Sequence, residues 1–331
     1  DQTCGVPGRR VADSLALIRD TIQYVTDRKI RAALVCLDQE KAFDRVSHEF
    51  MDRVLHGFGL GERFCNYVKI MYRDIISSVI VNGWKTDPFP VKSGVRQGCP
   101  LSPPLFVLVI ELLAEYIRNN PNIRGIPTPG DAKKEVKCSL YMDDVTLFCA
   151  DGGSVHSLLE ACKDFGRASG AKINVEKSQA KIFGRWDLCN EPLPFPVEAD
   201  LVKILGVWFG GPGAALKSWN ERLAKVKQKL GLWSLRNLSM EGKALVLRND
   251  ALPVLQYVTQ AWPLLANVAR AINSMVFKFV WNSKMDRVKR SVMHKEHRKG
   301  GKAVPDISTI LRTFFVCGCI RITLANENKD H

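Results

Sequence analysis

Three short apolar segments of this chain border acidic residues. Residues 32–37 (AALVCL) end at Asp38, and the runs 136–142 and 145–149 flank the pair Asp143-Asp144. Apolar runs of this length are typical of buried β-strands, and a polar pair between two of them predicts a hairpin with carboxylates at its tip. If the strand before Asp38 lies beside that hairpin, the carboxylates meet at one end of a sheet. The fold must therefore bury the strands while leaving these ends accessible.

Helical spacing of apolar residues surrounds the predicted strands. Helices are predicted over about 13–27, with Asp13 as the cap, and over 47–56, 62–72, 105–118 and 155–169. Further strands are predicted over 77–82, closed by a turn at Asn82-Gly83, and near 179–182 and 202–207. Because helices and strands alternate irregularly, without a parallel βαβ repeat, we predict an α+β fold.

Positive charge is concentrated in the carboxyl-terminal third. The formal net charge is +14, and residues 213–302 hold 18 basic and 5 acidic side chains, on helices such as the one predicted over 216–233. Such a concentration predicts a polyanion partner, since each neutralised phosphate releases counterions. A soluble basic surface is the alternative. After 210–213 (GGPG) the pattern changes to helices with basic faces, which predicts a domain boundary there.

The cysteines and the hydropathy indicate an intracellular protein. Ten cysteines occur without a CxxC pair, which favours reduced thiols. We see no leader and no apolar run long enough to cross a bilayer, so we expect no membrane partner, and we interpret the chain as a fragment of a longer polypeptide. One zinc cluster is conceivable, from His294, His297, Cys317 and Cys319, but the spacing favours two surface histidines and two thiols.

The three carboxylates suit metal-assisted phosphoryl transfer. That chemistry needs two divalent ions, one activating the attacking hydroxyl and one steadying the leaving pyrophosphate. Mg²⁺ takes oxygen ligands and keeps several waters, so a few carboxylates from separate strands suffice. Asp38, Asp143 and Asp144 form such a set if their strands are neighbours. An Asp-Asp pair alone is more often a solvated turn.

The order of several strings resembles a known family. Residues 37–44 (LDQEKAFD), 93–103 (SGVRQGCPLSP) and 141–144 (YMDD) resemble the palm motifs of reverse transcriptases, most closely those of non-LTR (LINE-type) retrotransposons. The likeness continues through 169–178 (SGAKINVEKS) and 204–207 (ILGV) and includes 2–9 (QTCGVPGR), so it spans nearly the whole chain.

The resemblance implies a right-hand polymerase: an antiparallel palm sheet backed by helices, with partial fingers and a helical thumb. We expect partial fingers and a connecting helix over 1–31, and the palm over 32–212 with a fingers insertion around 47–91. The basic thumb would cover 213–302 and a carboxyl-terminal helical extension 303–331, although 300–305 (GGKAVP) departs from the family's Gly-Gly-Leu-Gly-Leu-Pro-like string.

The resemblance also implies roles for residues of the site. Asp38, Asp143 and Asp144 would bind two Mg²⁺ ions, with Mn²⁺ as an alternative. Phe43 matches the aromatic residue that excludes a 2′-hydroxyl, which selects deoxynucleotides; its structural alternative is a core aromatic.

Arg96, Gln97 and Gly98 match the segment that contacts the incoming nucleotide, where glycine permits close backbone approach. Lys177 matches a lysine that protonates or neutralises the departing pyrophosphate, and Lys172 competes for that role. The segment Leu205-Gly206 resembles the primer grip, a hairpin that holds the primer end by its backbone, with a plain core strand as its alternative.

The implied activity is RNA-directed DNA polymerisation by two-metal nucleotidyl transfer, used in target-primed reverse transcription in the nucleus. Its partners would be an RNA template, a DNA primer and deoxynucleoside triphosphates. Because the fingers strands are incomplete, we expect weak activity from the fragment alone. Two alternatives stay open. One is a group II intron maturase-like enzyme or another template-directed polymerase, among which Phe43 argues against a version that makes RNA. The other is a catalytically inactive RNA-binding relative. Template specificity, fidelity and oligomeric state are not encoded in these motifs.

Overall fold

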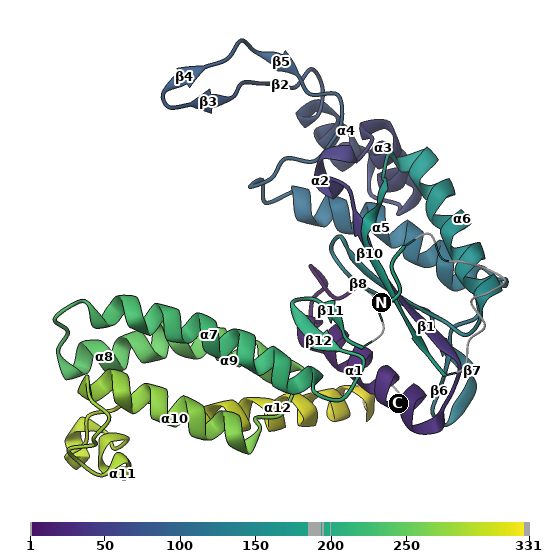
Figure 1. Cartoon of the computed structure of the whole chain (residues 1–331). Helices are drawn as coiled ribbons and strands as arrows, with labels where there is room; N and C mark the ends of the chain where they lie inside the picture. The colour runs from purple at the N-terminus through teal and green to yellow at the C-terminus, as the bar shows by residue number, and fades with distance from the viewer. Residues whose placement is uncertain (1, 185–192, 194, 199, 328–331) are drawn as a thin grey trace. The chain divides into compact units, whose positions relative to one another are not determined.

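The structure, a computed structural model, describes residues 2–184, 193, 195–198 and 200–327 (Figure 1). Its internal contacts fall into two compact units, Asp1–Ala199 and Asp200–His331. We call them the sheet unit and the helical unit and describe each by itself. The finer division into fingers, palm, thumb and extension stays a prediction.

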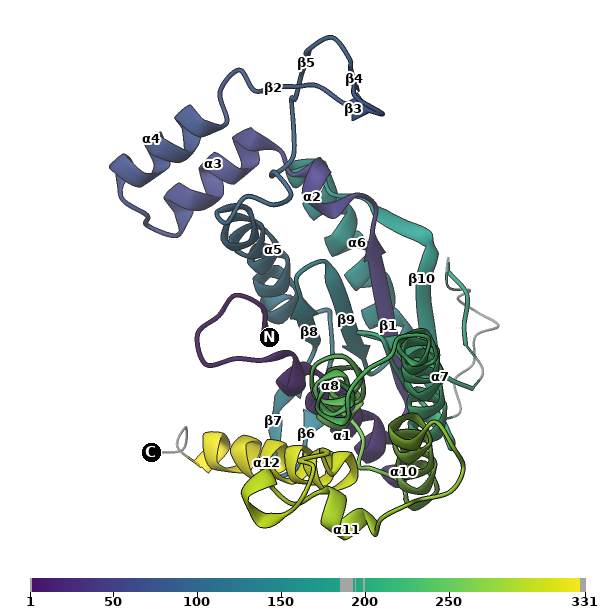
Figure 2. The same ribbon diagram turned by 90° about the vertical axis from the view of Figure 1, so that its left-hand side faces the viewer.

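A four-stranded antiparallel sheet forms the centre of the sheet unit. Its strands are β1 (Ala32–Gln39), β8 (Cys138–Tyr141), β9 (Asp144–Cys149) and β10 (Ile173–Phe183), in the order β10-β1-β9-β8 (Figure 2). The strand before Asp38 and the hairpin around Asp143 are thus confirmed, and they are neighbours. A small ribbon, β6 (Ile126–Thr128) with β7 (Asp131–Val136), precedes β8.

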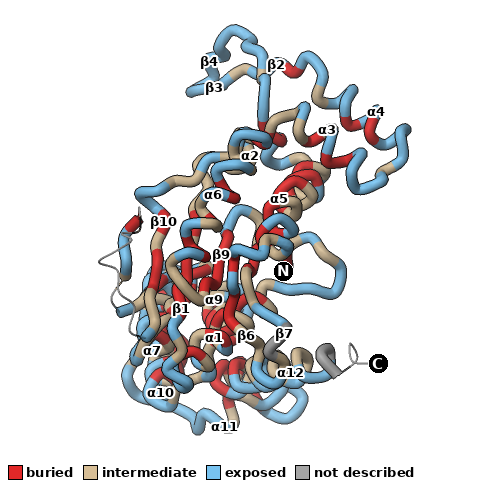
Figure 3. Tube along the Cα trace, turned by 90° about the vertical axis from the view of Figure 1, so that its right-hand side faces the viewer, coloured by how far each residue is buried: buried red, intermediate tan, exposed pale blue. Residues whose placement is uncertain are grey.

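Two long helices share a hydrophobic core with one face of this sheet. They are α5 (Ser102–Asn119) and α6 (Gly152–Ser169), and the core includes Leu37, Val145 and Leu147 together with Ile110 of α5 and Leu158 of α6. Side chains alternate between the two faces of a strand, so Asp38 and Asp144, the neighbours of Leu37 and Val145, lie on the other face. We call these the helix-covered face and the carboxylate face. The buried segments of β1, β9 and α5 are coloured red in Figure 3.

Helix α1 (Val11–Arg28) contacts β8. The prediction that Asp13 caps it is wrong: the N-cap is Arg10, and Asp13 lies three residues later, where its carboxylate accepts the Arg10 backbone N–H at 2.8 Å. The helix therefore starts earlier than the apolar spacing suggested. Asp13 still satisfies a backbone donor at the helix start, as the acidic residue of a capping box does.

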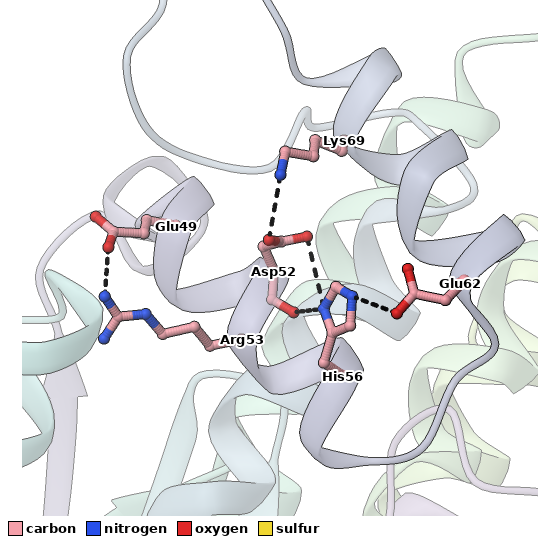
Figure 4. A network of polar contacts seen from close by, with 6 residues as sticks. All are labelled: Glu49, Asp52, Arg53, His56, Glu62 and Lys69. Carbon is pink, nitrogen blue, oxygen red and sulfur yellow. Dashed lines mark hydrogen bonds and ion pairs between the residues drawn. The ribbon is translucent and has the colours of Figure 1, made fainter.

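The segment after Asp38 forms a short helix, α2 (Ala42–Arg45), and a helical hairpin, α3 (His48–Gly57) with α4 (Glu62–Met71). Ser47 caps α3 by accepting the Phe50 backbone N–H. Figure 4 shows the polar network between the two helices, in which the His56 ring contacts Asp52 and Glu62. The hydrogen bond to the Asp52 carbonyl, followed by the nearby carboxylates, raises the pKa of His56. The network is exposed and contributes little stability.

The segment between α4 and α5 projects as a thin arm of short strands (Figure 1). The predicted strand over 77–82 is wrong in detail, because it is interrupted: β2 (Ile76–Ser77) pairs with β5 (Phe89–Pro90), and β3 (Ile80–Val81) pairs with β4 (Trp84–Lys85). The predicted turn at Asn82-Gly83 is confirmed, with φ of +50° and +84°.

The helical unit opens with a hairpin, β11 (Val202–Ile204) and β12 (Val207–Phe209). The apolar pattern alone predicted one strand over 202–207, whereas the resemblance to the primer grip implied a hairpin at Leu205-Gly206, and the hairpin is confirmed. Helix α7 (Ala214–Ser234) packs on β12. It shares a core with α8 (Met240–Val246), α9 (Leu252–Gln256), α10 (Ala266–Trp281), α11 (Arg290–Met293) and α12 (Ile307–Glu327). Trp219, in the second turn of α7, is fully buried, and its indole N–H donates to the Pro263 carbonyl at 3.0 Å.

Two expectations about the carboxyl-terminal region are changed. The Ile307–Leu324 window of α12 is long and apolar enough to cross a membrane by length and composition, contrary to the sequence expectation, although one such helix is weak evidence for a span. Within the described residues no group of three or more His, Cys, Asp or Glu side chains could enclose a metal ion. The zinc alternative is accordingly not supported. Instead, a hydrogen bond of 2.9 Å joins the His294 Nδ1 and the Val304 carbonyl oxygen.

Candidate active site

The sheet brings the predicted carboxylates together. Leu37 pairs with Val145 across β1 and β9, and Tyr141 pairs with Asp144 across the β8–β9 turn. Asp38, one residue after Leu37, therefore lies beside Asp144, one residue before Val145, on the neighbouring antiparallel strand. Asp143 lies in the turn itself. Residues separated by about 105 positions in the chain thus share one end of the carboxylate face.

Burial and repulsion between the carboxylates both affect the pKa of Asp144. Burial, followed by the charges of Asp143 and Asp38, raises the pKa of Asp144 from 3.8 to about 6. Asp144 is exposed by accessible area, but surrounding protein still displaces part of the hydration of its carboxyl group. All three causes favour the neutral acid, so negative charge here lacks compensation. Such a position suits a bound cation.

The backbone of Asp38 is held from β10. Its N–H donates to Ser178 Oγ at 3.1 Å, and that hydroxyl donates to the Asn174 carbonyl at 2.7 Å. The ladder between β1 and β10 is irregular at this point, between Cys36 and Asp38. The Ser178 hydroxyl thus replaces a ladder hydrogen bond and fixes the strand end that presents the carboxylate.

Gln2 is a site residue whose role the sequence did not reveal. It is buried, forms a parallel bridge with Leu140, and its Oε1 accepts the backbone N–H groups of Cys4 at 2.9 Å and Met142 at 3.3 Å. Met142 holds φ +56°, a left-handed conformation uncommon outside glycine. Gln2 therefore braces the turn that carries Asp143. The string 2–9 belongs to the family likeness, but only the fold shows this contact.

A second motif is attached to the segment that follows Asp38. Val95 donates its N–H to the Phe43 carbonyl at 2.7 Å, and Gly94 donates to the Val46 carbonyl at 2.8 Å. A Cβ on Gly94 would lie 2.7 Å from the Asp44 carbonyl oxygen, and φ is +94°, so only glycine fits. These two hydrogen bonds hold the segment that contains Phe43 against the start of the segment that continues to Arg96, Gln97 and Gly98.

The predicted nucleotide-contacting residues differ in burial. The Phe43 ring is half-buried and stacks on Phe106 of α5, with centroids 4.6 Å apart. Arg96, Gln97 and Gly98 are exposed, and a Cβ on Gly98 would meet no atom within 4 Å. The phenylalanine is therefore fixed by the core, whereas its neighbours along the motif are accessible to a ligand.

The two candidate lysines also differ. Lys172 pairs with Glu40 at 2.8 Å, and hydrogen bonds from Lys172 and Arg45 lower the pKa of Glu40 to about 2. Lys177 is exposed on β10 and has no carboxylate partner among the described residues. Lys177 is thus the more available of the two for an incoming phosphate.

The predicted primer-grip pair occupies the β11–β12 turn of the helical unit. Leu205 and Gly206 hold φ of +48° and +72°. The Tyr257 hydroxyl donates to the Leu205 carbonyl at 2.6 Å, and Arg222 donates to the Gly206 carbonyl at 3.1 Å. Arg222 also lies 5.1 Å from the centre of the Tyr257 ring. Both turn carbonyls are therefore held by side chains of the helices.

Comparison with known proteins decides the family. A model described as reverse transcriptase (RNA-dependent DNA polymerase) matches residues 5–209. The chain belongs to the reverse transcriptase family. It is 31% identical over 320 residues to the transposon TX1 uncharacterized 149 kDa protein of Xenopus laevis, covering 95% of this chain and 24% of that protein. It is 28% identical over 279 residues to a Pol polyprotein of retrotransposable element R2 from Popillia japonica, covering 79% and 38%.

These matches confirm the resemblance to reverse transcriptases of non-LTR retrotransposons, and the chain spans less than half of each relative. Apo telomerase from Candida Tropicalis is a structural neighbour, with a TM-score of 0.50 and 13% identity, covering 95% of this chain and 54% of that one. At this identity the likeness concerns the fold, and it confirms the α+β palm of a reverse transcriptase.

Reverse transcriptases generally use divalent metal ions and nucleic-acid templates, and the carboxylate end fits such an ion. Asp38, Asp143 and Asp144 supply hard oxygen ligands, and the raised pKa of Asp144 marks charge without compensation. Among the described residues no group of three or more His, Cys, Asp or Glu side chains is arranged to hold a metal ion by itself, and this finding includes the three aspartates. Polymerase sites are of this open type, because one or two carboxylates share the ion with water and substrate phosphates.

Proposed function

We propose that this reverse transcriptase chain is the catalytic core of an RNA-directed DNA polymerase. It copies an RNA template from a DNA primer with deoxynucleoside triphosphates, in target-primed reverse transcription in the nucleus. The single observation that supports this most is the side-by-side position of Asp38 and Asp144, with Asp143 in the adjoining turn.

Asp38, Asp143 and Asp144 would hold two Mg²⁺ ions, or Mn²⁺, which activate the primer hydroxyl and neutralise the leaving pyrophosphate. The protein's own contribution is positioning. Ser178 fixes the backbone at Asp38, and Gln2 fixes the turn before Asp144. The acids are thus set before substrate arrives, and binding energy need not be spent on arranging them.

Selection of the sugar is assigned to Phe43. Because its ring stacks on Phe106, it cannot swing aside without losing that contact. A 2′-hydroxyl directed at the ring would clash with it and lose its hydration, so deoxynucleotides bind better. Arg96, Gln97 and Gly98 are exposed and directly follow Val95, which is hydrogen-bonded to the backbone of Phe43. We assign them to the triphosphate and the base.

Lys177 is assigned to the departing pyrophosphate. An ammonium can donate charge-assisted hydrogen bonds to phosphate oxygens and transfer a proton. Lys177 is exposed, whereas Lys172 is occupied by Glu40. Leu205 and Gly206 are assigned to the primer strand through their backbone.

The proposal is tested by extension of a DNA primer on an RNA template with Mg²⁺ and deoxynucleotides. We expect extension by the chain, or by a version lengthened at its amino end, and its loss in Asp143→Asn. The matched control is Asp27→Asn, since Asp27 is an exposed aspartate at the end of α1, bonded only to Gln23 among the described residues. Binding of an RNA–DNA duplex without extension, in both lengths, would favour the inactive RNA-binding alternative.

A further inference from the structure

A pocket separate from the carboxylates lies beside α6 and the start of β10. Its volume is about 630 Å³, within the range of small-molecule and nucleotide sites, and it is lined by residues of the sheet unit only. Residues of α6 form one wall, the turn Gly170 to Ile173 forms another, and Arg45 and Phe195 complete it.

This pocket is separate from the carboxylates. Helix α6 lies on the helix-covered face, where its Leu158 and Cys162 share a core with Leu37 and Val145. Asp38 and Asp144 belong to the opposite face. A ligand in the pocket therefore contacts α6 rather than the catalytic residues.

Four cations line the pocket: Arg45, Lys163, Arg167 and Lys172. Glu40 bridges Arg45 and Lys172, with both distances 2.8 Å, and Asp164 lies 3.2 Å from Arg167. Lys163 has no carboxylate partner in the described part of the chain. The cations outnumber the carboxylates that pair with them, so the pocket keeps a positive potential.

One donor of this group lies buried and unused. The Nε of Arg45 has no hydrogen-bond partner in the described structure, although Arg45 also lines the pocket. An unpaired buried donor costs free energy unless an acceptor reaches it.

The rest of the lining is apolar and includes an aromatic ring. Leu159, Ile173, Val175 and Phe195 contribute apolar side chains, and Val175 is 46% exposed. A positive rim above an apolar floor suits a molecule with a flat, weakly polar body and an anionic group. A nucleotide has both parts, because its base stacks on apolar surfaces while its phosphate binds Arg or Lys.

The chain path is adapted to form this pocket. A Cβ on Gly166 would lie 2.6 Å from the Ala171 carbonyl oxygen, and one on Gly170 would lie 2.6 Å from the Arg45 carbonyl oxygen. Gly170 also holds φ +83°. Glycine at both positions lets the end of α6 lie directly against the segment that carries Arg45.

We propose that this pocket binds a nucleoside monophosphate unit, with its base on the apolar floor and its phosphate on Lys163 and Arg167. These two cations are four residues apart on α6 and thus lie on one side of the helix, with Cβ atoms about 5–6 Å apart. The unit comes either from single-stranded RNA or from a free nucleotide. An acidic protein segment would pair with the cations of the pocket but would leave its apolar floor without a partner.

The test compares binding of a 4-thiouridine-labelled 12-nucleotide oligo(U) RNA by the chain and by Lys163→Ala/Arg167→Ala. The control pair is Arg28→Ala/Lys134→Ala, which removes two exposed cations elsewhere in the sheet unit. We expect about tenfold weaker binding for the first pair and little change for the second. We also expect photo-crosslinks in peptides containing Val175 or Phe195, lost in the first pair.

Competition identifies the source of the unit. Displacement of the crosslink by UMP at the same nucleotide concentration indicates a free nucleotide, whereas resistance to UMP indicates RNA. Equal affinities of the two variant pairs, crosslinks only outside the pocket, or preferential displacement by polyglutamate would overturn the proposal. Extension of a pre-annealed short primer–template should be unchanged in both pairs, so failure here is distinguishable from failure of the proposed polymerase function.

Discussion

The two faces of the central sheet contrast sharply at the same strand positions. On the helix-covered face Leu37 and Val145 are 4% and 2% exposed and pack into a continuous core. On the carboxylate face their neighbours Asp38 and Asp144 repel each other, and burial penalises the charge of Asp144 further. One pair of strands thus gains stability on one side and loses some on the other.

The fold can keep mutually repelling carboxylates on one face of the sheet because the apolar core on the opposite face stabilises the same strands. Acidic side chains poised for a cation repel one another until the cation arrives. The residues that hold these acids in place, Ser178 and Gln2, act on backbone groups and leave the carboxylate oxygens available. Substitutions on the two faces should therefore have different consequences.

The largest expected effect is the loss of activity in Asp144→Asn. Removing a carboxylate that we propose binds the metal should lower the rate of primer extension by roughly a thousandfold, equivalent to about 4 kcal/mol of transition-state stabilisation. Circular dichroism should show an intact fold. Full activity in this variant would mean that the carboxylate face does not perform the chemistry.

The reverse behaviour is expected for Leu147→Ala on the helix-covered face. Leu147 is fully buried in the core, so truncation should lower the free energy of unfolding by about 3 kcal/mol. Extension measured well below the melting temperature should change little. Urea unfolding provides the measurement, with Val175→Ala at the half-exposed surface as the control; equal losses in the two would contradict the division between faces.

Phe43→Ala tests a residue that we assign to the substrate although its ring stacks on the core residue Phe106. Loss of the ring should reduce discrimination between deoxynucleotides and ribonucleotides by roughly 30-fold, or about 2 kcal/mol. Single-nucleotide incorporation with each substrate gives the ratio. Unchanged discrimination would restrict Phe43 to a structural role.

Gln2→Leu should reduce extension by about tenfold without changing the KM for primer–template. The substitution removes the acceptor of the Met142 N–H and leaves that part-buried donor without its protein partner, at a cost of about 1 kcal/mol. Gln23→Leu, on the exposed side of α1, is the matched control. Comparable loss in both would show that Gln2 has no special relation to the turn.

The smallest effect is a gain in stability of Asp144→Asn without metal. A carboxyl group whose folded pKa is raised destabilises the native state increasingly as pH rises from about 4 to about 6. The variant should therefore match the wild type below pH 4 and, above pH 6, exceed it by about 1 kcal/mol after allowance for solvent screening, or roughly 2–4 °C in Tm. A constant difference across pH would contradict this cause.

Local patterns predicted much of the sheet unit. The apolar runs before Asp38 and around Asp143 became β1, β8 and β9, because buried strands leave a clear hydrophobic pattern. The turn at Asn82-Gly83 was predictable from its residue types. The interruption between β2 and β3 was not, since those residues are exposed and carry no pattern of burial.

Tertiary contacts account for what the sequence could not show. Gln2 and Met142 meet only because the amino-terminal segment lies beside β8, and a lone glutamine gives no sign of this. The apolar pattern over 202–207 suggested one strand, and only the family resemblance implied the turn that Leu205 and Gly206 form. The pocket beside α6 likewise depends on Arg45 and Phe195, which are far apart in the chain.

The clamped turn of the helical unit has a mechanical consequence. Tyr257 and Arg222 hold the carbonyls of Leu205 and Gly206 from two separate segments of the helical unit, so a change in the backbone of this turn must break or move with both hydrogen bonds. Because Arg222 belongs to α7, a displacement of that helix also acts on the turn. If a primer end rests there, as we propose, its position is coupled to that of α7.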